Sequence, residues 1–180
     1  MPKSKDNLVW IDCEMTGLDP DKNVLLEIAA IITNNDLDIV AEGPCLAIHQ
    51  TESKLSAMDR WNQTHHSRSG LLTRMRQSKV NTADAEREML KFIRQYCYKG
   101  KSPLCGNSIG QDRRFLVKYM PKLHDFFHYQ NIDVSSVKQL VMRWYPKKHH
   151  ARPKKNTHRA LPDIKESIEE LKHYRAKVFK

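Results

Sequence analysis

Two carboxylates follow an unbroken apolar run near the start of the chain. Residues 8–11 are all apolar, and Asp12 and Glu14 come next, with Cys13 between them. Side chains alternate along a strand, so the two acids would point to the same side. Hard divalent cations such as Mg²⁺ and Mn²⁺ prefer oxygen ligands, and an Asp-x-Glu pair offers two together. The alternative is a strand that reaches the surface and ends in solvated acids, so further ligands must decide.

Three other residues could complete such a site. Asp112 lies in the first turn of one predicted helix, and Asp163 lies in the first turn of the last one. His158 precedes Asp163 by five residues, a spacing that does not share a helical face, so it would approach from the loop. Acids near helix N-termini also occur simply because they interact favourably with the helix dipole. Each residue alone therefore has an ordinary structural explanation.

The elements that must position these residues form a mixed α/β pattern. The apolar run from residue 8 to 14 and the segments that follow it predict an antiparallel meander, and later short strands alternate with helices. The expected strands are 8–14, 24–33, 37–41, 45–49, 103–106 and 132–134. The expected helices are 52–58, 69–75, 82–97, 108–119, one from Ser135 and one from Pro162, with 61–66 irregular. Ser108 and Gln111 fit a capping box.

Composition limits the class of protein. With 180 residues, the chain is expected to form a single domain, 1–180, with an N-terminal tail at 1–6 and a basic loop at 146–157. No apolar run approaches the ~20 residues that span a bilayer, and no secretory signal is visible, so no membrane association is expected. Four cysteines without Cys-x-x-Cys spacing favour reduced thiols and a cytoplasmic location. The net charge of +10 suits a polyanion such as nucleic acid, although it also serves solubility.

Read together, the acids and the histidine are much more specific. The order Asp-x-Glu, a distant Asp and His-x-x-x-x-Asp resembles the histidine-bearing DEDD exonuclease superfamily. The resemblance is greatest to its oligoribonuclease family and covers roughly residues 7–175. It is carried by WIDCEMTGLDP at 10–20, AEGP at 41–44, CGNSIGQDRRF at 105–115, KYMP at 118–121, FHY at 127–129 and DVS at 133–135.

This resemblance implies a ribonuclease-H-like fold and a homodimeric 3′-to-5′ exoribonuclease that acts on very short single-stranded RNA, dinucleotides especially. It implies two Mg²⁺ or Mn²⁺ ions held by Asp12, Glu14, Asp112 and Asp163, with His158 taking a proton from the attacking water. The chemistry agrees, because two cations can stabilise both the attacking and the leaving oxygen of a phosphoryl displacement, and a histidine titrates near neutrality.

The resemblance also implies substrate contacts. Leu18 would wedge between the two bases at the 3′ end, and backbone phosphates would be held by Ser108, His128, Ser135 and Lys138. Trp61 and His66 are further candidates from the residues alone, because an aromatic side chain there could stack on a base. Ordinary roles remain open, because Leu18 and Trp61 could pack on the core, Ser108 and Ser135 could cap helices, and Lys138 could be solvated.

Two positions depart from the family pattern. Pro162 stands beside Asp163 where the family usually has an acid, and Gln130 stands where it usually has Arg. At the 5′ end of the substrate, Gln130 keeps an amide donor but lacks the planar, charged fork that Arg offers to a phosphate. The competing functions are a related exonuclease that trims longer RNA or DNA and a catalytically silent RNA-binding module. A silent module has no need for four converging acids, which favours the enzyme.

Overall fold

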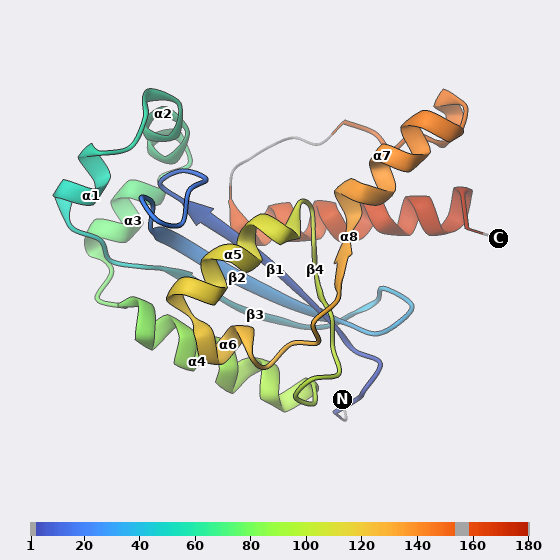
Figure 1. Cartoon of the computed structure of the whole chain (residues 1–180), viewed down its shortest axis with the longest axis horizontal. Helices are drawn as coiled ribbons and strands as arrows, with labels where there is room; N and C mark the ends of the chain where they lie inside the picture. The colour runs from blue at the N-terminus through green and yellow to red at the C-terminus, as the bar shows by residue number, and fades with distance from the viewer. Residues whose placement is uncertain (1–2, 154–158, 180) are drawn as a thin grey trace.

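A five-stranded mixed sheet, in the order β3-β2-β1-β4-β5, forms the centre of the computed structural model, which describes residues 3–153 and 159–179 (Figure 1). β1 and β3 pair antiparallel with β2, whereas β4 pairs parallel with both β1 and β5. The strands are β1 Leu8–Met15, β2 Leu25–Thr33, β3 Ile39–Ala47, β4 Leu104–Gly106 and β5 Asn131–Asp133. The predicted meander with added parallel strands is confirmed.

Helices cover both faces of this sheet (Figure 1). They are α1 Glu52–Ser56, α2 Arg60–Arg68, α3 Leu71–Gln77, α4 Thr82–Tyr96, α5 Ile109–Tyr119, α6 Pro121–His124, α7 Val134–Trp144 and α8 Ala160–Lys177, with a 3₁₀ turn at Lys147–His149. In the described part of the chain, none of them is long and apolar enough to cross a membrane.

The alternation of side chains along β1 assigns each face of the sheet to its own set of helices. Val9, Ile11 and Cys13 pack with residues of α4, α5 and α6, whereas Leu8 and Trp10 pack with residues of α7 and α8. Because the period of a strand is two residues, the next even positions after Trp10 also face α8. β1 therefore directs both of its carboxylates toward the helix that carries the last predicted acid.

The end of β4 lies against β1, which brings the start of α5 to the same edge of the sheet. A Cβ on Gly106 would lie 3.0 Å from the carbonyl oxygen of Ile11 and 2.9 Å from the Ile109 side chain. Glycine allows this close approach, whereas a side chain here would force one of these neighbours to shift. Parallel strands end at the same edge of a sheet, so the loops after β4 and β5 meet there.

Several predicted boundaries were wrong. Residues 61–66 are not irregular but belong to α2, whose N-cap Asp59 accepts a hydrogen bond from the Asn62 backbone nitrogen at 2.8 Å. β3 continues through Gly43 and Pro44, where a break was expected, because the β2–β3 register shifts between Ala29 and Ile31 and absorbs the irregularity. α8 begins at Ala160, which leaves Pro162 within the first turn, where a missing N–H does no harm.

Candidate active site

Three acids from two distant segments meet beside the sheet. Asp12 and Glu14 project from β1, and Asp163 projects from the first turn of α8. One carboxylate oxygen from each lies within 4.8 Å of the other two, so the three could hold a metal ion. Four predicted metal ligands were expected to converge here, and three of them do so in this geometry.

Burial makes this cluster unfavourable when it carries its full negative charge. Burial is the largest cause that raises the pKa of Glu14 to about 8, and the charges of Asp163, Glu27 and Asp112 raise it further. Arg74 acts in the opposite direction. Close carboxylates stay ionised together only with compensating positive charge. A divalent cation therefore suits the donor set, because it supplies this charge.

Asp112 approaches the same strand from α5 but makes a backbone contact. One of its oxygens accepts a hydrogen bond from the Cys13 backbone nitrogen at 2.8 Å. This nitrogen is available because the pairing of β1 with β4 ends at Trp10 and Cys105. Burial raises the pKa of Asp112 to about 7. A carboxylate has a second oxygen, so its predicted role as a metal ligand stays compatible with this bond.

The predicted general base, His158, lies outside the described residues, together with 154–157 of the basic loop. Its neighbour Arg159 is described, and the Arg159 backbone nitrogen donates a hydrogen bond to Asp163 Oδ2 at 3.2 Å. The role of His158 therefore stays a prediction.

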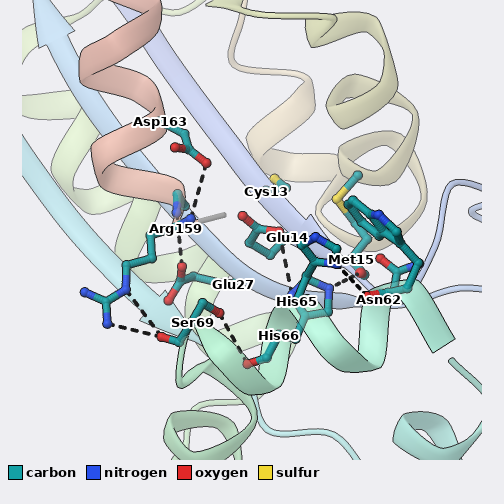
Figure 2. Close-up of polar contacts among 12 residues, drawn as sticks. Cys13, Glu14, Met15, Glu27, Asn62, His65, His66, Ser69, Arg159 and Asp163 are labelled. Atoms are coloured by element: carbon teal, nitrogen blue, oxygen red, sulfur yellow. Dashed lines mark hydrogen bonds and ion pairs between the residues drawn. The ribbon is translucent and has the colours of Figure 1, made fainter. Parts of the chain in front are cut away.

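His66 of α2 is buried and lies beside Glu14 and Met15 at the end of β1 (Figure 2). Its Nε2 lies 2.9 Å from the carbonyl oxygen of Met15, an acceptor, so Nε2 carries the proton of this bond. Its Nδ1 lies 3.9 Å from Glu14 Oε2. His66 thus holds the end of β1 in place, and its predicted stacking on substrate stays untested.

A second group of polar residues gathers where β4 and β5 end. The Asp133 Oδ1 atom accepts hydrogen bonds from the backbone nitrogens of Ser108 and Ser135, both at 2.9 Å. The Ser108 hydroxyl donates to the Ser135 hydroxyl at 3.1 Å. Ser108 adopts a left-handed conformation with φ of 51° and makes no side-chain cap, so the predicted capping box is wrong. Asp133, not Ser135, is the N-cap of α7.

Lys138 joins this group through α8. Its Nζ lies 4.0 Å from Glu170 Oε1, and Glu170 also accepts hydrogen bonds from Asn107 and Tyr174, both at 3.0 Å. Glu170 follows Asp163 by seven residues, almost two complete turns, so both lie on one side of α8. α8 thus carries Asp163 of the acidic cluster and also contacts Lys138 and Asn107. We call Ser108, Ser135 and Lys138 the serine–lysine group.

Comparisons with known proteins identify the family. The exonuclease family RNase_T matches residues 9–171. An oligoribonuclease of Dichelobacter nodosus is 57% identical over 175 residues, which cover 97% of this chain and 96% of the relative. One of Shewanella sp. strain MR-4 is 55% identical over 180 residues, 100% of this chain and 99% of the relative. The chain belongs to the oligoribonuclease family. The predicted family is confirmed.

Solved structures support the fold. Exonuclease I without ligand has a TM-score of 0.73 at 14% identity, covering 97% of this chain and 43% of that one. Escherichia coli exonuclease I in complex with a dA16 oligonucleotide gives 0.73 at 14% identity, covering 96% and 41%. This chain therefore spans less than half of those proteins, and the likeness confirms the predicted ribonuclease-H-like fold class alone.

The aromatic and aliphatic contacts that the oligoribonuclease resemblance implies lie on the surface near the end of β1. Leu18 is 71% exposed, and its carbonyl accepts a hydrogen bond from Gln111 of α5 at 2.5 Å. Trp61 is 56% exposed and stacks on His65, with ring centroids 3.8 Å apart. Exposed apolar groups of this kind are available to bases, so the ordinary role of core packing does not apply to Leu18 or Trp61.

His128 and Gln130 lie on the loop before β5 and line one hollow with Lys101. His128 Nδ1 accepts a hydrogen bond from the Gln130 backbone nitrogen at 3.2 Å. Arg113 of α5 holds this loop through the carbonyl oxygens of His128 and Tyr129. His128 lines this hollow, and its phosphate contact stays a prediction.

Sequence reasoning overlooked the residues that hold the site together. Asp133 organises both serines, Glu170 lies beside Lys138, and Arg113 fixes the loop of His128. Glu27 gave the clearest signal, because it is the one charged residue in the apolar segment 24–33. A charge inside a buried strand requires a partner.

Proposed function

We propose that the protein is a metal-dependent 3′-to-5′ exoribonuclease that hydrolyses very short oligoribonucleotides, dinucleotides especially, to nucleoside 5′-monophosphates. The observation that carries this proposal is the meeting of Asp12, Glu14 and Asp163 within 4.8 Å, in a chain of the oligoribonuclease family. Asp112, which accepts a hydrogen bond from the Cys13 backbone nitrogen, would complete the set of metal ligands.

Each residue of the proposed site has a defined task. The four acids would hold two Mg²⁺ or Mn²⁺ ions, which when bound supply positive charge to the attacking and leaving oxygens. His158 would take a proton from water as the water oxygen forms a bond to phosphorus. The bond from phosphorus to the 3′ oxygen then breaks, and this oxygen gains a proton from solvent. The products are a nucleoside 5′-monophosphate and an RNA shortened by one residue.

The serine–lysine group would bind the phosphate at the other end of a short substrate. Two hydroxyls and an ammonium group provide hydrogen bonds and positive charge, both suited to a phosphate. His128 would add a further contact, and Leu18 would lie against the 3′ base with Trp61 and His66 nearby. A site that is closed at both ends favours a substrate whose length fills it.

The decisive experiment is a series of RNAs from two to seven residues, with and without a 5′ phosphate. We expect the dinucleotide with a 5′ phosphate to be hydrolysed fastest. A charged hydrogen bond is worth ~1.5–3 kcal/mol and a neutral one about half of that, so Gln130 should make the demand for this phosphate modest. Gln130→Arg should tighten binding of the phosphorylated dinucleotide but not of the form without phosphate. Equal rates at all lengths would instead favour a general exonuclease.

We also propose a homodimer. Tyr129 is 79% exposed and Trp144 is 70% exposed, and Leu140 lies on the same helix as Trp144. The sequence also predicts Phe126 and Phe127 for this interface, but both are buried and belong to the core. Exposed aromatic residues are enriched in subunit interfaces.

Light scattering at micromolar concentration should therefore give about twice the chain mass of 21.1 kDa. Trp144→Glu should shift the mass toward the monomer, because burying a charge in an apolar interface is unfavourable. Phe179→Glu, at an exposed residue near the C-terminus, is the matched control. A parent protein that scatters as a monomer would reject the dimer.

We place the protein in the cytoplasm. The four cysteines are free, and Cys13, Cys97 and Cys105 are buried. Free thiols persist in reducing compartments. Fractionation of cells that make the tagged protein would test this location.

A further inference from the structure

A buried carboxylate lies beside the acidic cluster. Glu27 on β2 stands opposite Glu14 on β1 in the antiparallel register, and it is 1% exposed. Like charges on directly opposite residues repel each other. A buried carboxylate also needs partners that replace its hydration. The position of Glu27 is therefore unfavourable unless its contacts compensate for both effects.

Both oxygens of Glu27 are engaged away from the cluster. Glu27 Oε1 accepts a hydrogen bond from Arg74 Nη2 of α3 at 2.5 Å. Glu27 Oε2 accepts one from the backbone nitrogen of Ala160, the first residue of α8, at 3.3 Å. A carboxylate at a helix N-terminus is favoured by the unpaired N–H groups and the helix dipole. Glu27 thus fixes the start of the helix that carries Asp163.

A second link holds the same helix end (Figure 2). The Arg159 guanidinium donates to the carbonyl oxygen of Ser69 from Nε at 3.3 Å and from Nη2 at 3.2 Å. Arg74 Nη1 donates to the same oxygen at 3.3 Å. Ser69 is the C-cap of α2, which also carries His66. Arg74 therefore connects Glu27 with the point where Arg159 is anchored.

We propose that Glu27 and Arg74 form a positioning pair that sets Asp163 against β1 by fixing the first turn of α8. This inference rests on the metal site proposed above and adds the residues that hold its geometry. Glu27 accepts hydrogen bonds from Arg74 at one oxygen and from Ala160 at the other, so its role in this proposal is to hold the start of α8. Neither residue of the pair needs to touch the substrate.

The direction in which Mg²⁺ affinity changes when Arg74 is removed distinguishes a positioning role from a purely electrostatic one. Arg74 is a positive charge near a cation site, so its removal should strengthen Mg²⁺ binding if only the field matters. If Arg74 positions Asp163, its removal should weaken Mg²⁺ binding. Changes around metal ligands typically lower affinity ~10–100-fold. Titration at pH 9, above the pKa of about 8 at Glu14, limits competition from protons.

The experiment compares Arg74→Gln and Glu27→Gln with Arg76→Gln. Arg76 lies on the same helix and pairs with Glu52 in an exposed ion pair, so it is a matched control. Calorimetry measures Mg²⁺ binding, and hydrogen–deuterium exchange of residues 159–164 in EDTA measures the helix end without metal. We expect both test variants to bind Mg²⁺ about tenfold more weakly and to exchange about tenfold faster, with the control like the parent.

The proposal would be overturned if Arg74→Gln leaves hydrogen–deuterium exchange of residues 159–164 unchanged and binds Mg²⁺ as tightly as the parent or more tightly. Loss of Mg²⁺ binding in Glu27→Gln with unchanged exchange would also overturn it, because Glu27 would then be a ligand. If Arg74→Gln does not fold, Arg74→Lys keeps the charge but not the two-armed contact, and the same criteria apply. A parent that binds no Mg²⁺ would reject the metal site, whereas the exchange result would still decide the positioning.

Discussion

Removal of divalent metal with EDTA should abolish hydrolysis, and Mg²⁺ or Mn²⁺ should restore it. Asp12, Glu14 and Asp163 present their oxygens within 4.8 Å of one another, an arrangement that suits a cation. Stabilisation of the reacting oxygens by bound metal is worth several kcal/mol, so Asp12→Ala should lower the rate at least ~10³-fold. Single-turnover hydrolysis of a labelled dinucleotide measures this loss.

Asp36→Ala serves as the control, because Asp36 is an exposed acid paired with Arg175. It should leave the rate unchanged. Thermal unfolding of Asp12→Ala should show that the fold persists. Full activity in EDTA would exclude the metal site as a whole.

In the metal-free protein, the free energy of unfolding should depend on pH through the titration of Glu14. Its pKa is raised from 4.5 to about 8 in the folded protein, mainly by burial, so the folded state binds more protons than the unfolded state between these values. The contribution of Glu14 to stability is therefore largest below pH 4.5 and is lost as the pH rises through 8. Bound Mg²⁺ should oppose this loss, because it binds the ionised carboxylate.

Glu14→Gln isolates this effect from the other titrating groups, because Gln cannot lose a proton. In EDTA, the parent and the variant should melt at similar temperatures at pH 5, and the parent should melt lower at pH 9. If the difference in melting temperature between the parent and Glu14→Gln is the same at pH 5 and pH 9, the pKa of Glu14 is not raised.

How far the sequence predicted the structure differs between elements. β1 was predictable because its apolar run and its period of two require no information from the rest of the chain. α2 was not, because it is largely exposed and lacks the apolar stripe that marks a helix, so its N-cap Asp59 was its main signal.

The candidate site shows the same division. The types of the acids and their order along the chain were visible in the sequence, and they were enough to predict the family. The bond between Asp112 and the Cys13 nitrogen was not predictable, because it depends on where the pairing of β1 with β4 ends. The left-handed backbone of Ser108 depends equally on a distant residue, Asp133, which accepts its N–H.

His158→Ala should lower the rate ~10²–10⁴-fold at saturating Mg²⁺, the usual cost of losing a general base. At saturating metal the carboxylates are held ionised, so the remaining rise of rate with pH should report the histidine, a residue type that titrates near neutrality. This rise should vanish in His158→Ala, because a neutral histidine is the active form. Mg²⁺ binding by calorimetry should persist, since His158 is not a predicted ligand.

His150→Ala is the matched control from the same basic segment. Its Nε2 lies 3.2 Å from the carbonyl oxygen of Tyr145, so it has a local structural contact. The control should keep both the parent rate and its pH profile. If His158→Ala stays within a few-fold of the parent, or if its rate still rises through the same pKa, another group takes the proton from water.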